Sequence, residues 1–273
     1  MSLEAKSDNF WKLIEKDATV KQVSTGFTFT EGPVFSRRGF LLFSDIPNNK
    51  ILKWERGQLT TLRENSNKAN GLTFDHQGRL LAAEGGGRVT RTEKSGAVTV
   101  LAEDGLQAPN DLVYSIDGSI YFTDLPKSRV YQITRQRSGV GGSPPKGEVR
   151  LVAETPAPNG VALSPNQQQL YVADVKTGVV KVHDIAGDGR LDSGRDFANV
   201  RVDGLKTDES GNVWMASRDG IYVRDSAGQE LGVIRTPEGP SNCCWGEGFR
   251  GLYITARKSV YHLPTKVSGT RTF

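Results

Sequence analysis

Six polar residues open six copies of a degenerate unit that repeats along the chain. Each copy begins with a carboxylate or carboxamide side chain and continues as a short apolar segment, a turn and a second apolar segment. In the first copy, Glu31-Gly32-Pro33-Val34-Phe35 leads through a turn into Phe40-Leu41-Leu42-Phe43-Ser44-Asp45. The opening residues recur at intervals of roughly 40 residues, and they are Glu31, Asn70, Asn110, Asn159, Asp203 and Asn242.

These side chains carry hard oxygen atoms, which suit Ca²⁺, Mg²⁺ or Mn²⁺ better than they suit metals that prefer thiolate or imidazole. Glu31 and Asp203 together bring two negative charges, enough to balance one divalent ion. Ca²⁺ takes about 6–8 oxygen ligands, so three or four protein ligands leave positions for water and substrate. The residue types therefore predict a catalytic site for a divalent cation. Ca²⁺, Mg²⁺ and Mn²⁺ are the candidates by ligand type, and Zn²⁺ is kept as a further alternative.

Short strands must position these residues. Each unit contains β-branched and aromatic segments separated by Asp-Gly, Gln-Gly or Ser-Gly turns. Third and fourth strands are expected in several units, for example over 50–54 and 59–62, and over 129–133 and 149–152. Four strands in each of six units predict an all-β fold, a six-bladed β-propeller with four-stranded blades around a central channel.

The propeller is expected to form a single domain over residues 1–273. A short helix over about 7–17 should lie outside the blades, and Val20 to Val23 should supply or brace an outer strand that closes the ring. The glycine- and proline-rich stretch from Arg135 to Gly147 is expected to be a flexible hairpin tip, which accounts for the one long interval between openings.

In a propeller, the innermost strands of all blades start at the same end of the channel, so the six opening residues should face one axis. A buried polar group without a partner costs roughly 1–3 kcal/mol, and a bound cation removes that cost. Asn-Gly, Pro-Asn and Asp-Gly are ordinary turn dipeptides when taken singly. Their joint recurrence at matching positions favours the cation site.

Composition limits the function classes. The chain has 273 residues, 36% hydrophobic content, 31 glycines and a formal charge of +4, with no long run of like charges. A nucleic-acid or membrane partner is therefore not expected. The N-terminal segment lacks an apolar signal core, which predicts a cytoplasmic protein, or a periplasmic or secreted one if a signal peptide has been removed. A monomer or weak dimer is expected.

The remaining reactive side chains do not form a second site in the sequence. Cys243 and Cys244 are adjacent, so two reduced thiols are expected. The three histidines, His76, His183 and His262, do not have the spacing of a zinc site. No serine lies in a nucleophile-elbow pattern with a matching histidine.

Four of the openings also carry a family resemblance. Glu31-Gly32-Pro33, Pro109-Asn110-Asp111, Pro158-Asn159-Gly160 and Asp203-Gly204 resemble the motifs of the superfamily of gluconolactonase, senescence marker protein, luciferin-regenerating enzyme and diisopropyl fluorophosphatase. The likeness covers about residues 20 to 263 and is strongest to bacterial gluconolactonases.

The resemblance implies a six-bladed propeller with a divalent cation, commonly calcium, at the top of the channel. It places metal ligands at Glu31, Asn159 and Asp203, with Asn110 as a fourth ligand or a contact to substrate. The implied activity is hydrolysis of a small-molecule sugar lactone such as gluconolactone. Two loops at the mouth, before Asn110 and after Asp124, are shorter here than in those lactonases.

For the mechanism, we expect the cation to polarise the lactone carbonyl. Asp203 should activate the attacking water or attack directly, and general-base action is preferred. Asn110 should orient the substrate, and Asn70 and Asn242 should bind sugar hydroxyls. Two alternatives stay open: a phosphotriesterase-type hydrolase on the same scaffold, and a non-catalytic binding propeller whose cation only fills the channel.

Overall fold

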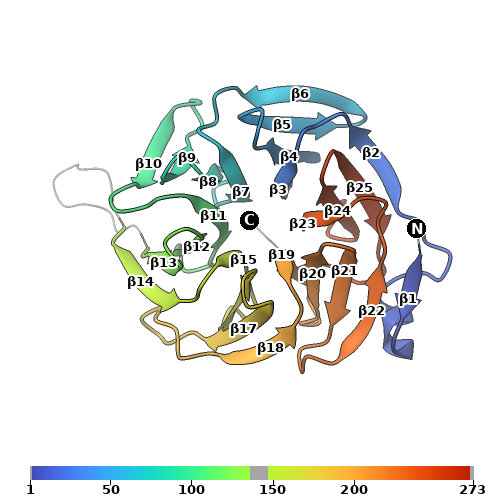
Figure 1. Cartoon of the computed structure of the whole chain (residues 1–273). Coiled ribbons are helices and arrows are strands. Elements are labelled where there is room, and N and C mark those ends of the chain that lie inside the picture. The colour runs from blue at the N-terminus through green and yellow to red at the C-terminus, as the bar shows by residue number, and fades with distance from the viewer. Residues whose placement is uncertain (1, 136–146, 271–273) are drawn as a thin grey trace.

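The computed structural model describes residues 2–135 and 147–270. Its strands form six antiparallel sheets arranged in a ring around a central channel (Figure 1). The predicted six-bladed β-propeller is therefore confirmed, and so are the third and fourth strands expected in the first and third units. Nearly all of the predicted hairpin tip lies outside the described residues.

Each blade runs outward from the channel in chain order, so its first strand is the innermost. Blade 1 comprises β3 (Thr30–Ser36), β4 (Phe40–Asp45), β5 (Lys50–Glu55) and β6 (Gln58–Arg63). Blade 2 comprises β7 (Ala69–Phe74), β8 (Leu80–Glu84), β9 (Arg88–Thr92) and β10 (Val98–Ala102). Blade 3 comprises β11 (Pro109–Tyr114), β12 (Ile120–Asp124), β13 (Arg129–Ile133) and β14 (Val149–Glu154). Blade 4 comprises β15 (Pro158–Leu163), β16 (Gln169–Asp174), β17 (Val179–Asp184) and β18 (Arg195–Asn199).

The last two blades each borrow a strand from the N-terminal segment. Blade 5 comprises β19 (Val202–Thr207), β20 (Val213–Ser217), β21 (Gly220–Arg224) and β22 (Glu230–Ile234), with β1 (Leu3–Ala5) paired outside β22. Blade 6 comprises β23 (Pro240–Gly246), β24 (Gly251–Ala256) and β25 (Ser259–Pro264), with β2 (Lys21–Thr25) as its outer strand. The predicted closing strand is thus β2, which joins the first part of the chain to the last blade. The fifth strand on blade 5 was not predicted.

The predicted N-terminal helix is shorter than expected and is a 3-10 helix, η1 (Asp8–Lys12). Its first turn is capped by the Ser7 hydroxyl, which accepts a hydrogen bond from the N–H of Asn9. Phe10 and Ile14 are fully buried in a cluster with side chains of blades 5 and 6. Burial of such side chains contributes roughly 1.5–3 kcal/mol each, so packing rather than helix length holds this segment against the ring.

The chain after β25 turns inward at the end of the channel where the inner strands finish. Gly269 forms an isolated bridge with Asp208, and the N–H of Thr270 donates to the carbonyl of Thr207 at 3.1 Å. This segment covers the hairpin end of β19. No helix among the described residues is long and apolar enough to cross a membrane.

Candidate active site

The opening residues lie on β-bulges at the start of the inner strands. In every blade, the pairing of the first strand with the second shifts register there, as between Glu31 and Val34 or between Pro158 and Val161. A bulge adds an unpaired residue and re-aims its side chain. The bulges are all at the same end of the ring, so they direct polar side chains from separate blades towards the channel.

Strand register confirms that five of the six openings are equivalent and corrects the sixth. Asp203 lies two residues before Leu205, which pairs with Met215, and the openings of blades 1 to 4 keep this spacing when the Val34–Leu42 pairing is continued back to Pro33. The residue of blade 6 equivalent to Leu205 is Cys243, which pairs with Ile254, so the opening position belongs to Ser241 and Asn242 lies one residue further. Ser241 is buried, and its hydroxyl donates to the Thr30 carbonyl at 2.7 Å. The amide of Asn242 resembles the other openings in chemical type, whereas its position in the register depends on how β23 pairs with β24.

The equivalent openings differ in burial. Glu31 and Asn159 are buried, whereas Asn70, Asn110 and Asp203 are partly exposed. Among the described residues, Oδ1 of Asn70 is one of the few buried side-chain polar atoms without a hydrogen-bond partner. Such an atom carries a free-energy cost unless a ligand satisfies it.

The carboxylates of the site repel one another electrostatically. Burial raises the pKa of Glu31 well above its usual value, and the nearby carboxylates of Asp203 and Asp111 raise it further. Burial also raises the pKa of Asp203 to about 6, although the Asn159 amide donates a hydrogen bond that acts in the opposite direction. The arrangement therefore disfavours negative charge in the absence of a cation.

Two residues of the channel were missed from the sequence, Asp111 and Lys206. Asp111 is 3% exposed, and its Oδ2 lies 3.4 Å from Nδ2 of Asn242 and 3.8 Å from Nζ of Lys206. By strand register it occupies the position that holds glycine in four other blades. A carboxylate at a glycine position, and a lysine inside an inner strand, were signals visible in the repeat.

The donor set fits a hard divalent cation. Electrostatic interactions connect Glu31 with Asp203, and a hydrogen bond connects Asp203 with Asn159. Asn110 and Asn70 share the strand position of these residues, and Oδ1 of Asn70 has no partner; all five side chains offer hard oxygen atoms. No group of three or more His, Cys, Asp and Glu side chains within the described ranges is placed to hold a metal. An ion at this site would therefore depend on amide as well as carboxylate oxygens.

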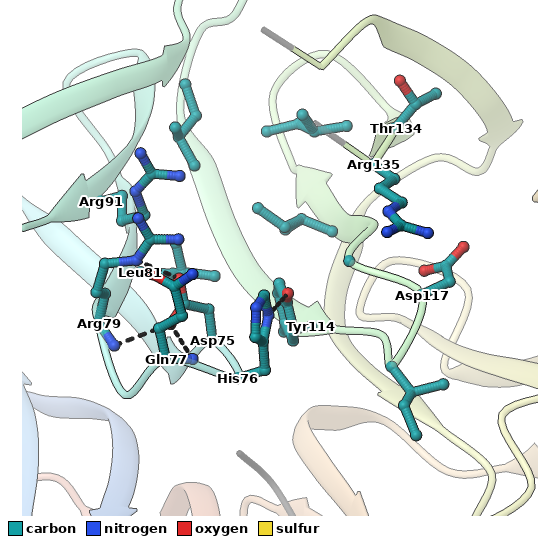
Figure 2. Close-up of a pocket in the computed structure, with 15 residues that line it drawn as sticks. Asp75, His76, Gln77, Arg79, Leu81, Arg91, Tyr114, Asp117, Thr134 and Arg135 are labelled. Atoms are coloured by element: carbon teal, nitrogen blue, oxygen red, sulfur yellow. Dashed lines mark hydrogen bonds and ion pairs between the residues drawn. The ribbon is translucent and has the colours of Figure 1, made fainter. Parts of the chain in front are cut away.

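His76 lies apart from this site. His76 and Tyr114 line a cavity of about 530 Å³ between blades 2 and 3, where Nδ1 of His76 contacts the Tyr114 hydroxyl at 2.5 Å (Figure 2). The cavity is at the hairpin end of the inner strands, and its Arg79 is paired with Asp75 and Glu93. These contacts serve the turns rather than the opening residues.

The two cysteines follow Asn242 on β23, and the other two histidines lie on the third strands of their blades. Cys243 and Cys244 are buried free thiols, as predicted, and burial raises the pKa of Cys243 to about 12. His183 lies against Asp192 on blade 4, and His262 lies against Glu247 on blade 6.

Comparisons with known proteins match most of the chain. Residues 29–258 match the family described as SMP-30/gluconolactonase/LRE-like region. A gluconolactonase from Zymomonas mobilis is 29% identical over 304 residues, which cover 94% of this chain and 84% of that protein.

Solved structures agree with this match. A gluconolactonase from Xanthomonas campestris is 28% identical with a TM-score of 0.87, covering 97% of this chain and 95% of that one. A calcium-binding regucalcin from Agrobacterium tumefaciens has the same fold at 16% identity, with a TM-score of 0.78 and coverage of 94% and 96%. Because the family match spans most of the propeller, the chain belongs to the SMP-30/gluconolactonase/LRE-like family.

Proposed function

We propose that this protein is a lactonase that opens a sugar lactone with the help of a divalent cation. Relatives called gluconolactonases at 28–29% identity, aligned over nearly the whole chain, support lactone hydrolysis. The observation that carries the cation is the pair of opposed carboxylates, Glu31 and Asp203, whose pKa values burial raises at the mouth of the channel. An amide oxygen of Asn70 without a partner lies in the same ring.

Glu31, Asn159 and Asp203 would hold the ion, with Asn110 as a fourth ligand or a contact to substrate. Calcium is the first choice because the donors are all oxygens and none is a thiolate or imidazole. When bound, such an ion supplies polarisation of a carbonyl and stabilisation of an oxyanion.

Each of the polar side chains around the ion has its own role in the reaction. Asp203 accepts the proton of the attacking water, and a pKa of about 6 in the ion-free protein leaves it largely ionised at neutral pH. The Asn159 amide, which donates to Asp203, keeps that carboxylate oriented. Asn110 orients the substrate, and the free Oδ1 of Asn70 accepts a hydrogen bond from a sugar hydroxyl.

Asn242 receives a different role from the one predicted. It is 2% exposed, and its Nδ2 donates to Oε2 of Glu31 at 3.1 Å while its Oδ1 accepts from the N–H of Cys243 at 2.9 Å. Because its amide is engaged within the protein, we assign it to the orientation of Glu31 rather than to a sugar hydroxyl.

Acid release from gluconolactone and a panel of other lactones, esters and phosphotriesters tests this function. We expect turnover of at least one sugar lactone, its loss in chelator and its return with Ca²⁺. Asp203→Asn should abolish turnover. Asp225→Asn, in a turn of the same blade, should not, because Asp225 serves its own turn through hydrogen bonds from Ala227 and Gln229. Turnover that survives chelation, or no turnover on any compound, would refute the proposal.

A further inference from the structure

A second layer of side chains lies one residue beyond the opening ring. Register places Gly32, Gly71, Gly160 and Gly204 at this position in four blades, and Asp111 and Asn242 in the other two. A Cβ atom on Gly71 would lie 2.6 Å from Oδ1 of Asp111, and one on Gly204 would lie 2.1 Å from Cγ of Asn242. The glycines therefore leave room for one carboxylate and one amide in the channel.

A lysine side chain reaches this layer. Lys206 is on β19, three residues after Asp203, where the other inner strands carry Val34, Thr73, Val113, Ala162 and Cys244. Its Nζ lies close to three oxygen atoms. The distances are 3.0 Å to the carbonyl oxygen of Leu205, 3.3 Å to Oδ1 of Asn242 and 3.8 Å to Oδ2 of Asp111. The lysine side chain is 19% exposed and that of Asp111 only 5%.

The charge count of the channel changes with this contact. Glu31, Asp111 and Asp203 together would carry three negative charges, one more than a single divalent ion balances. The ammonium of Lys206 compensates Asp111, which is its ion-pair partner. The four side chains then carry a net charge of minus two, which comes from Glu31 and Asp203 and which one divalent ion balances.

The same ammonium supports the direction of an amide, together with the N–H of Cys243, which donates to Oδ1 of Asn242 at 2.9 Å. A lysine ammonium can only donate hydrogen bonds, so its contact selects Oδ1 of Asn242 as the atom that faces it. Nδ2 of Asn242 is thereby turned towards Glu31 at 3.1 Å and Asp111 at 3.4 Å. Asn242 is therefore the one side chain between Lys206 and the expected metal ligand Glu31.

We propose that Lys206 is a positioning residue that serves as a built-in cation of the channel. It occupies a position surrounded by three oxygen atoms, compensates Asp111 and helps the Cys243 N–H to turn Asn242 onto Glu31. The negative charge that remains balances one divalent ion only. This inference rests on the proposed function for the role of Glu31, but the pairing of Lys206 with Asp111 can be tested without any metal.

The metal-free arm is a double-mutant cycle measured in chelator. Lys206→Met should lower the melting temperature by roughly 5–10 °C, the loss expected when a buried ion pair keeps one charged partner. Adding Asp111→Asn to Lys206→Met should restore at least half of that loss, and Lys206→Arg should cost far less. Additive effects of the two substitutions, or no loss in Lys206→Met, would overturn the pairing.

The metal arm is a calorimetric Ca²⁺ titration of the same proteins. We expect one ion per chain in the wild type and in Lys206→Arg, two in Lys206→Met, and one again in the Lys206→Met, Asp111→Asn double variant. A merely structural lysine would lower stability without changing the number of ions. One ion in Lys206→Met would overturn the built-in cation, whereas no ion in the wild type would refute the proposed function and leave the pairing to be decided by the cycle.

Discussion

The ion-free protein should be destabilised by its own active-site carboxylates. Burial raises the pKa of Asp203 from 3.8 to about 6, a shift of roughly two units, and one unit corresponds to about 1.4 kcal/mol. The ionised carboxylate therefore costs about 2–3 kcal/mol of folding free energy, and Glu31 acts in the same direction because its pKa is also raised.

The sign of the pH dependence follows from proton binding. A carboxylate with a raised pKa in the folded state holds more protons there than in the unfolded state between about pH 4 and pH 6. The contribution of Asp203 to stability therefore falls as the pH rises through this window, and the full cost is present above about pH 6. A cation that binds the ionised pair should reverse the loss, by about 2.7 kcal/mol at 100 times its Kd.

Urea or thermal unfolding of wild type and Asp203→Asn checks this reasoning. In chelator at pH 8, the variant should be the more stable protein by about 2–3 kcal/mol, or roughly 5 °C for a chain of this size, and the difference should shrink towards pH 4. In Ca²⁺ the order should reverse, because the variant loses a charged ligand. Asp225→Asn, in the partly exposed turn between β21 and β22 of blade 5, should show neither effect. A variant that is less stable than wild type in chelator at pH 8 would refute the account of opposed charges.

Three further outcomes follow from the site. Asn159→Ala should weaken Ca²⁺ binding by roughly tenfold or more, and an unchanged calorimetric titration would contradict its place in the ligand set. Gly204→Ala should lower kcat/KM by roughly tenfold, since its Cβ would lie 2.1 Å from Cγ of Asn242 and a small misplacement near reacting groups is costly; Gly187→Ala, which meets nothing within 4 Å, is the control. Protons compete with the ion for Asp203, so Ca²⁺ affinity should fall as the pH decreases through about 6, and equal affinities at pH 5.5 and pH 8 would argue against that ligand.

Much of the fold was predictable because the repeated sequence motif marks the start of each inner strand. Turn dipeptides and polar openings recur with each blade, and the outer strand over Lys21–Thr25 was expected from the need to close the ring. The strand over Leu3–Ala5 was not expected, because it pairs with residues such as Ile234 at the far end of the chain. A strand of only three residues has no local sequence pattern strong enough to predict such a contact.

The limits of the site prediction have a physical origin. Side-chain type suggested Asn242 as the sixth opening, but the bulge between Pro240 and Asn242 places Ser241 there. A bulge is set by hydrogen bonding to the neighbouring strand, which sequence spacing alone does not determine. Asp111 and Lys206 escape prediction for the opposite reason, because each marks a point where one blade departs from the pattern that the repeats share.

A crystal of this protein grown with Mn²⁺ tests the central claim most directly. An anomalous difference map should show one strong peak at the channel mouth, with oxygen atoms of Glu31, Asn159 and Asp203 at roughly 2.0–2.6 Å. A map without a peak there, or with the ion bound by other residues, would contradict the proposal that distant carboxylate and amide side chains converge to hold a cation.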